Sequence, residues 1–286
     1  MANQSIVNSS QIEKRGRSGK VLRVLAVRRD DLYSPNNVAE DLGILQSTAH
    51  LLGEALGVDV PVVDEPAFAS RPADADIYIS MGRMPATLAV LSAKEREGRV
   101  VVNSSEAVRR CVRSQLDRLM RSQGIAMPPL TGTHGVWIKR GDAAAQTPDD
   151  VVYCPDAGSF AKARQAFLER GITDFVVSAH VEGDVVKFYG VGTAMFRCFY
   201  PGDDGISKFG DERLNGKTHH YPYDAAALHA EVVRLASLTG TAVYGGDAIV
   251  DKDGRFYIID FNDWPSFSRC RDEAAEAICR YVVDSL

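Results

Sequence analysis

The sequence lacks the features of several large protein classes. None of its apolar runs approaches the ~18 residues that a membrane span needs, and the polar residues 1–20 have no apolar centre like that of a secretion signal. Lys and Arg number 33 against 38 Asp and Glu, a net charge of -5. This balance argues against general binding to nucleic acid or anionic membranes. We therefore expect a cytoplasmic protein that binds neither; no pattern indicates an oligomeric state.

Cysteine is scarce and scattered. The sequence contains no CxxC pair, and its five cysteines are Cys111, Cys154, Cys198, Cys270 and Cys279. An odd number at these spacings argues against a disulfide scaffold or a structural zinc site. A thiol nucleophile would need a histidine that only the fold could bring near, so buried packing is the simpler interpretation.

The chain has 286 residues, of which 45% are hydrophobic and 25% charged, and this composition is typical of a globular protein of about two domains. Short β-branched runs alternate with helical spacing in the first third, which predicts a parallel sheet with covered faces. The second half predicts α+β structure with antiparallel pairing. Residues 1 to about 20 are expected to be a flexible tail, and the character of the chain changes after Pro128 and Pro129.

The segment that follows the first domain has the composition of one long helix. It reads SSEAVRRCVRSQLDRLMRSQ, with Ser104 as the N-terminal cap and Gly124 directly after the last turn. Serine is a favoured N-cap and glycine a favoured C-terminal stop. We therefore predict a single continuous helix between these two residues.

Acidic and amide side chains gather near the C-terminal end, in YGGDAIVDKDGRFYIIDFNDWPSF. Strand alternation places Asp260 and Asn262 on one face, and the DKDG turn folds the preceding strand back. Pairing of Ile249 with about Ile258 would bring Asp247 opposite Asp260. Two carboxylates and an amide suit Mg²⁺ bound together with a nucleotide. The alternative is that these are ordinary turn residues at hairpin ends.

This acidic end resembles the metal-binding end of the ATP-grasp superfamily, and the resemblance extends over about residues 21–286. The other matching segments are the linker helix VVNSSEAVRRCVRSQLDRLMRSQGIAMPP, the strand GVWIKR and the hinge with its following strand, VVSAHVEGDVVKFYGVG. The resemblance implies an α/β and α+β chain with the ATP-grasp fold. After the flexible tail (1–20), its parts would be an N-terminal parallel α/β domain (21–104), a linker helix with a small central subdomain (105–177) and a C-terminal subdomain with an antiparallel sheet and the metal site (178–286).

The resemblance also implies a nucleotide site that binds ATP with Mg²⁺, or with Mn²⁺ in its place. Metal ligands would be Asp247, Asp260 and Asn262. Phosphate contacts would come from Arg113, Lys139 and Lys187, adenine contacts from the backbone of Ala179 and Val181, and a ribose contact from Glu182. From the strand pattern alone, Lys139 could equally be a solvated lysine, and Lys187 either reaches water or points into a cleft.

Catalytic cations around the γ-phosphate would be Lys187, Arg197 and Arg213. A polar connection after the strand TAMFRCFY suits an anionic acceptor, either a small molecule or a peptide. Acceptor contacts would come from Lys208, Arg213, Asn215 and, after the metal strand, Ser266. The neighbouring His219 and His220 are interpreted as loop residues.

Three functions fit these residues. The first is a carboxylate–amine ligase that works through an acyl phosphate, similar to RimK- and glutathione-synthetase-like ligases. The second is an inositol or polyol phosphate kinase, because Asp260 stands where ligases usually carry Glu and because NDWPSF resembles the exit of inositol-trisphosphate 5/6-kinase-like proteins. The third is a nucleotide-binding module without turnover.

Overall fold

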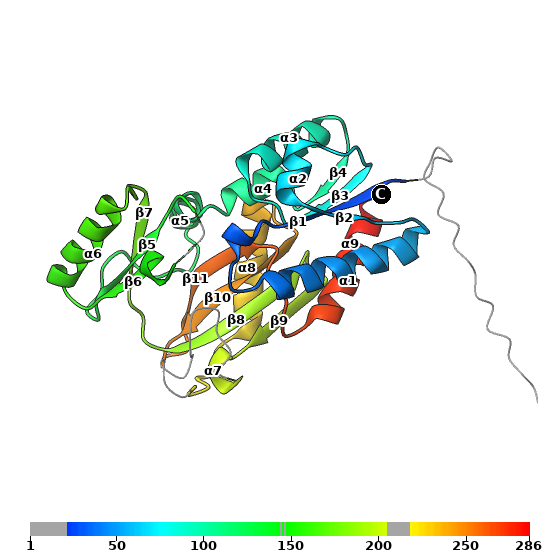
Figure 1. The fold of residues 1–286 in the computed structure, drawn as a ribbon. Coiled ribbons are helices and arrows are strands. Elements are labelled where there is room, and N and C mark those ends of the chain that lie inside the picture. The colour runs from blue at the N-terminus through cyan, green and yellow to red at the C-terminus, as the bar shows by residue number, and fades with distance from the viewer. Residues whose placement is uncertain (1–21, 144, 146, 205–217) are drawn as a thin grey trace, which may run out of the picture.

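The computed structural model describes residues 22–143, 145, 147–204 and 218–286, which form three β-sheets with covering helices (Figure 1). The first sheet is parallel, with strand order β2-β1-β3-β4. Its elements, in chain order, are β1 (Val24–Arg28), η1 (Asp31–Tyr33), α1 (Val38–Leu56), β2 (Val62–Asp64), α2 (Glu65–Ser70), β3 (Ile77–Ser80), α3 (Pro85–Arg96) and β4 (Val100–Val102).

Both faces of the parallel sheet are buried, which is why its strands are almost continuously apolar. One face packs Leu25 and Tyr78 against α2 and α3. The other face packs against α1 and against α9 (Arg271–Asp284), whose Ile278 and Val282 belong to the same core as Val24. Figure 1 shows α9 beside α1, so the last helix of the described residues joins the core of the first sheet.

The smallest sheet lies at one end of the molecule (Figure 1) and has the antiparallel order β6-β5-β7. Ile138 on β5 is fully buried against Phe167 of the covering helix. Because side chains alternate along a strand, the next residue, Lys139, projects from the opposite, open face. The elements are β5 (Val136–Arg140), η2 (Pro148–Asp150), β6 (Val151–Cys154), α6 (Ala157–Glu169) and β7 (Phe175–Ala179).

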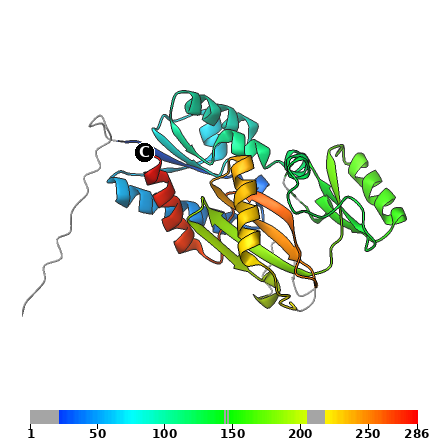
Figure 2. The ribbon, with the colours of Figure 1, turned by 180° about the vertical axis from the view of Figure 1, so that it is seen from behind.

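The third sheet is antiparallel, with order β11-β10-β8-β9. Figure 2 shows α8 lying across its back, where Phe188 and Phe261 pack against Leu228 and Val232 of that helix. On the opposite face, Tyr189 and Val191 belong to the core that includes α9, so only the other end of that face can carry polar groups. The elements are β8 (Asp184–Val191), β9 (Met195–Phe199), α7 (Pro201–Asp204), α8 (Ala225–Thr239), β10 (Val243–Val250) and β11 (Phe256–Asp263).

The prediction of one continuous helix after Ser104 is wrong. The segment forms α4 (Ser105–Arg110) and α5 (Arg113–Ser122), and Ser104 caps only α4, with its hydroxyl accepting from the amide of Ala107 at 3.2 Å. Val112 between the helices is extended, with φ -61° and ψ 128°. Tertiary contacts flank this break: Sγ of Cys111 lies 3.5 Å from Oγ1 of Thr241, and the amide of Ser114 donates to the carbonyl of Gly141 at 3.0 Å. The break makes Arg113 the first residue of a new helix.

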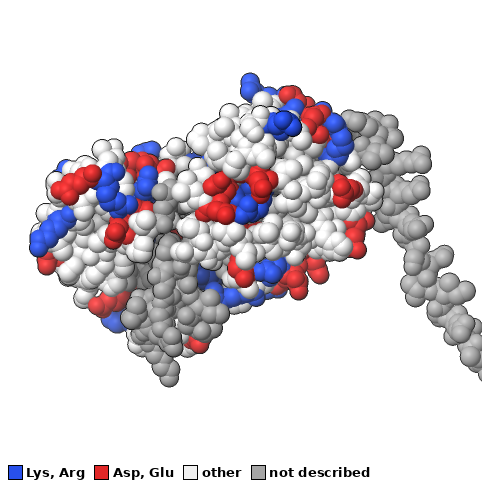
Figure 3. Space-filling model, in the orientation of Figure 1, with Lys and Arg blue, Asp and Glu red and all other residues white. Residues whose placement is uncertain are grey.

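The expected domain boundaries at residues 20, 104 and 177 remain a prediction. No helix in the described part of the chain is both long enough and apolar enough to cross a membrane. On the face seen in Figure 3, basic and acidic side chains are interspersed rather than gathered into a field of one sign.

Gly246 allows β10 and β11 to approach closely. A Cβ at this position would lie 2.1 Å from the carbonyl oxygen of Asp260. We predict that Gly246→Ala lowers the free energy of unfolding by about 2 kcal/mol, because one strand must move away from the other. Gly158→Ala in α6 is the control, since its Cβ would approach only the Asp156 carboxylate, at 3.3 Å. Urea unfolding measures both, and equal losses would contradict the close-approach explanation.

Candidate active site

Three charged side chains form a row across the open face of the third sheet. Lys187 on β8 pairs with Asp247 on β10, which pairs in turn with Asp260 on β11. Nζ of Lys187 donates to Oδ1 of Asp247 at 2.6 Å, and both side chains are mostly buried. The predicted juxtaposition of Asp247 with Asp260 is therefore present in the structure.

The register that produces this row is not the predicted one. Ile249 pairs with Tyr257 rather than with Ile258, and a β-bulge between Asp247 and Ala248 then restores the pairing of Asp247 with Asp260. The bulge leaves Ile259 out of the ladder. Its carbonyl oxygen accepts a hydrogen bond from Nζ of Lys139 at 3.2 Å. A bulge thus both aligns the two carboxylates and links this sheet to the small sheet.

Asn262 completes the group of oxygen donors. Its amide nitrogen donates to Oδ2 of Asp260 at 2.8 Å, which leaves its amide oxygen as a possible ligand. Across the described residues, no group of three or more His, Cys, Asp or Glu side chains could hold a metal ion. Two carboxylates and one amide oxygen nevertheless fit Mg²⁺, which takes its remaining ligands from phosphates and water.

Two further cations reach the site from other elements. Lys139 comes from β5, and Arg113 is the first residue of α5, where its Nη1 donates to the carbonyl of Arg140 at 2.6 Å. A cation at a helix N-terminus opposes the helix dipole. The nearby carboxylate of Asp260 compensates for this, and the helix break described above is what places Arg113 there.

The pKa values reflect this crowding of charge. Burial opposes ionisation of Asp260, but Arg113, Lys139 and Lys187 outweigh it, so its pKa lies below the ordinary value. Burial likewise lowers the pKa of Lys187, but its ion pair with Asp247 more than offsets this and the net pKa is raised. The pKa of Lys139 is lowered, because burial outweighs the attraction of Asp260.

With all five groups charged, three cations face two carboxylates at one end of the open face. The surplus is positive, and the cations come from three different elements. A small surplus of positive charge around partly buried oxygen ligands suits a polyanion that brings its own divalent cation. The arrangement is therefore suited to a metal–triphosphate.

The hinge residues lie at the end of β7. The backbone amide of Ala179 donates to the carbonyl of Pro129 at 2.7 Å, so this amide is already used by the protein. The carbonyl of Ala179 and the backbone of Val181 remain as candidate adenine contacts. Glu182 is exposed and lies 3.2 Å from Nδ1 of His134.

Not every predicted residue joins this cluster. Arg197 on β9 is exposed and forms an ion pair with Glu273 at the start of α9, with Nε 3.1 Å from Oε2. Ser266 lies in the turn after β11, between Trp264 and Phe267, whose φ angles of 39° and 49° are left-handed. The predicted acceptor residues Lys208, Arg213 and Asn215 lie outside the described residues.

Cys111, which lies between α4 and α5, is half-buried. Burial, followed by the charge of Asp263, raises the pKa of Cys111 to about 12. Its thiol is therefore neutral near pH 7, and nucleophilic thiol chemistry requires the thiolate.

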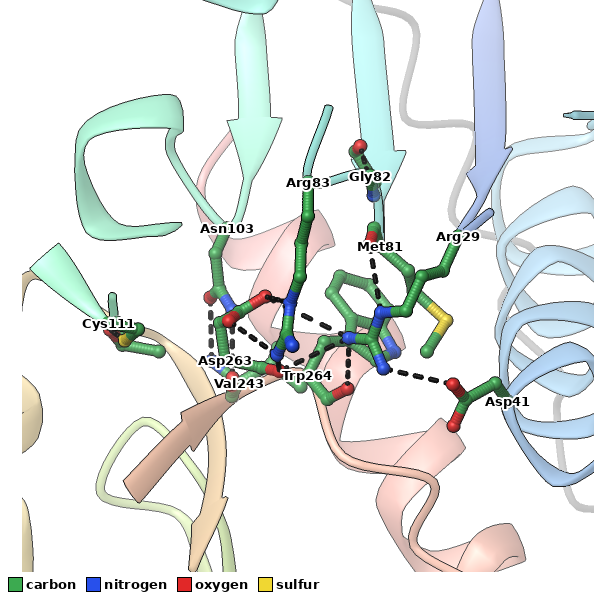
Figure 4. Close-up of polar contacts among 12 residues, drawn as sticks. Arg29, Asp41, Met81, Gly82, Arg83, Asn103, Cys111, Val243, Asp263 and Trp264 are labelled. Carbon is green, nitrogen blue, oxygen red and sulfur yellow. Dashed lines mark hydrogen bonds and ion pairs between the residues drawn. The ribbon is translucent and has the colours of Figure 1, made fainter. Parts of the chain in front are cut away.

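Sequence reasoning missed three side chains at the carboxyl ends of the parallel strands, which Figure 4 shows directed at the third sheet. Arg29 follows β1, Arg83 follows β3 and Asn103 follows β4. Arg83 and Arg29 contact Asp263, the residue directly after Asn262, while Asn103 bonds to the start of β10. Polar residues just after parallel strands are a recognisable signal, because functional groups collect at that edge in α/β folds.

Comparison with solved structures places the chain in a known fold. It resembles D-alanine–D-alanine ligase from Bacillus anthracis complexed with ATP (TM-score 0.64, 10% identity, 93% of this chain and 98% of that chain). It also resembles a RimK-domain ATP-grasp protein from Sphaerobacter thermophilus (0.60, 20%, 91% and 99%). A third is the ATP-grasp ligase PsnB complexed with minimal precursor, Mg and ADP (0.60, 17%, 91% and 96%).

No protein-family model and no curated protein matches the sequence. The structural likeness covers nearly the whole chain, so the protein has the ATP-grasp fold. The predicted fold class is confirmed, with one parallel sheet and two antiparallel sheets.

The lowered pKa of Lys139 generates a prediction about pH. The protonated amine binds phosphate, so ATP affinity should fall as the pH rises from neutral towards the ordinary lysine pKa of 10.5. Lys139→Arg keeps its charge over this range and should lose that component of the pH dependence. Lys139→Ala should weaken ATP binding about tenfold at neutral pH, because it removes a charged donor. Calorimetric titration across pH measures all three, and identical pH profiles for wild type and Lys139→Arg would contradict the assignment.

Proposed function

We propose that this protein is an ATP-grasp-type, Mg-ATP-dependent carboxylate–amine ligase. The observation that carries the proposal is the meeting of Lys139 and Arg113 with the Lys187–Asp247–Asp260 row. These cations and oxygen ligands come from separate elements, and no packing requirement explains why five charged groups should gather at a sheet face.

Each group has a role in this proposal. Asp247, Asp260 and Asn262 would hold Mg²⁺, which supplies charge stabilisation at the phosphates. Arg113, Lys139 and Lys187 would bind and orient the phosphate oxygens, where fixed cations stabilise charge developing in phosphoryl transfer. The carbonyl of Ala179, the backbone of Val181 and the carboxylate of Glu182 would receive the nucleoside.

The reaction would run in two steps. In the first step, an acceptor carboxylate oxygen attacks the γ-phosphorus and the bond from this phosphorus to the β-phosphate oxygen breaks. ADP is released and an acyl phosphate is formed. An amine nitrogen then attacks the acyl carbon, the bond to the phosphate oxygen breaks, and the amide, inorganic phosphate and a proton result. The protein's contribution is mainly positioning and charge stabilisation.

We propose an anionic small molecule or peptide as the acceptor. The sequence places Lys208, Arg213 and Asn215 in the connection after β9 and Ser266 after the metal strand. Among the structural neighbours, PsnB is complexed with a precursor peptide, and the other ligase named above is a D-alanine–D-alanine ligase. Catalytic roles for Arg197 and Arg213 belong to the same proposal, although Arg197 would first have to leave Glu273.

A second candidate is a small-molecule kinase, in which a hydroxyl replaces the carboxylate as the nucleophile. The shorter carboxylate at Asp260, in place of the Glu usual in ligases, favours it. The same phosphate and metal contacts would serve either reaction.

An acceptor screen tests the two candidates. We expect ADP release that requires Mg²⁺ and an acceptor carboxylate, with an amide product seen by mass spectrometry. Amino acids and short acidic peptides form one panel, and polyol phosphates form the other. A stable phosphorylated polyol would instead support the kinase. If ATP with Mg²⁺ failed to raise the melting temperature, both candidates would be lost.

Asp260→Asn tests the metal assignment. We predict loss of Mg²⁺-dependent turnover with the fold retained, because one ligand charge disappears from an otherwise unchanged side chain. Asp253→Asn in the turn of the same hairpin is the matched control, since within the described part of the chain the Asp253 carboxylate forms ion pairs only with its neighbours Lys252 and Arg255. Circular dichroism checks the fold. Wild-type turnover in Asp260→Asn would remove the metal site.

A further inference from the structure

The two strands that carry the candidate metal ligands are held at one end by the N-terminal parallel sheet. Asn103 binds the start of β10: its Oδ1 accepts from the amides of Ala242 and Val243 at 2.9 and 2.8 Å, and its Nδ2 donates to the carbonyl of Val243 at 2.8 Å. Arg83 and Arg29 bind the end of β11. The first domain therefore fixes the strands on which Asp247, Asp260 and Asn262 stand.

Asp263 is the centre of this attachment. It directly follows Asn262 and is 3% exposed. Nη2 of Arg83 donates to its Oδ1 at 2.7 Å and to its backbone carbonyl at 3.1 Å, while Nε lies 3.3 Å from Oδ2 (Figure 4). The guanidinium thus holds both the side chain and the backbone of one residue. Such a forked contact restricts the strand end more than a single bond from a lysine would.

Arg29 also contacts Asp263, with its Nη2 3.3 Å from the backbone carbonyl oxygen and 3.8 Å from Oδ2, but it has further partners. It bonds to Oδ2 of Asp41 at 2.9 Å, to the carbonyl of Trp264 at 2.9 Å and to the carbonyl of Met81 at 3.2 Å. These bonds join α1, β3 and the turn after β11, so Arg29 serves the packing of several elements. Arg83 bonds only to Asp263 among the described residues, and its effect is directed at the metal strand.

The backbone that carries the two arginines is itself fixed. Glu65 is fully buried, and its carboxylate accepts from the amides of Asp30 and Met84, each adjacent to one of the arginines. Gly82 leaves room for it, because a Cβ there would lie 2.9 Å from Oε1 of Glu65. The guanidinium of Arg83 therefore projects from a rigid turn.

A buried ion pair of this kind adds little net stability, because removing both charges from water costs about as much as their attraction returns. Its main effect is geometric. We propose that Arg83 and Asp263 are a positioning pair that orients Asn262, and with it Asp260, for binding of the divalent cation. This inference rests on the proposed function, since it assumes that these residues ligate the metal. Neither residue would touch substrate.

The test is the Mg²⁺ dependence of ATP binding, measured by calorimetry at increasing Mg²⁺ and, separately, with the metal chelated. In Arg83→Met, we expect the Mg²⁺ concentration for half-maximal effect to rise about tenfold, as for other residues that orient metal ligands. ATP binding without metal should be unchanged. Arg83→Lys keeps the charge but not the forked contact, so its Mg²⁺ requirement should lie between those of the wild type and Arg83→Met. Asp263→Asn should show a smaller rise than Arg83→Met.

Arg99→Met is the matched control. Arg99 pairs with Asp76 at the amino ends of β4 and β3, whereas Arg83 lies beyond the carboxyl end of β3. Loss of Arg99 should therefore lower the melting temperature without changing the Mg²⁺ requirement. If folded Arg83→Met has the wild-type Mg²⁺ requirement, the inference is overturned. If Arg83→Met does not fold, Asp263→Asn decides in the same way. Wild-type protein without Mg²⁺-dependent ATP binding, or Asp260→Asn that retains it, would instead remove the proposed function.

Discussion

The antiparallel pairing of β10 with β11, interrupted by one bulge, is the constraint on which the candidate site depends. Without the bulge, the register set by the turn would place Asp247 opposite Ile259 rather than opposite Asp260. The same irregularity frees the carbonyl of Ile259 for Lys139, which lies on a different sheet. One unpaired residue thus aligns the carboxylates and joins the small sheet to the large one.

The charged state of most groups at the site depends on a neighbour of opposite charge. Asp260 stays ionised in a partly buried position because three cations surround it, and Lys187 stays charged because of Asp247. Lys139 is the exception, since burial outweighs the carboxylates near it. A phosphate would supply the missing negative charge beside Lys139. The site therefore has the electrostatic character of a half-complete cluster that an anionic ligand completes.

Much of the fold and of the candidate site could be predicted from the sequence, namely the parts that depend on local patterns. The apolar strands of the parallel sheet and the oxygen ligands on β11 follow from side-chain alternation, which is local. The helix break at Val112 could not be predicted, because the contacts that flank it, such as that of Cys111 with Thr241, 130 residues away, are tertiary. The bulge is likewise decided by the pairing of two strands. Arg29, Arg83 and Asn103 carried a readable signal at strand ends, but their partners on β10 and β11 are set by the tertiary structure.

The placement of α9 has a consequence for how the chain is made. Its Ile278 and Val282 belong to the same core as Val24 of β1 and Ile77 of β3, more than two hundred residues earlier in the sequence. A ribosome releases the first sheet and α1 long before it releases α9, which completes their shared core. The nascent N-terminal part must therefore keep the apolar side chains that pack with α9 exposed until that helix has been made, a period in which a chaperone could shield them.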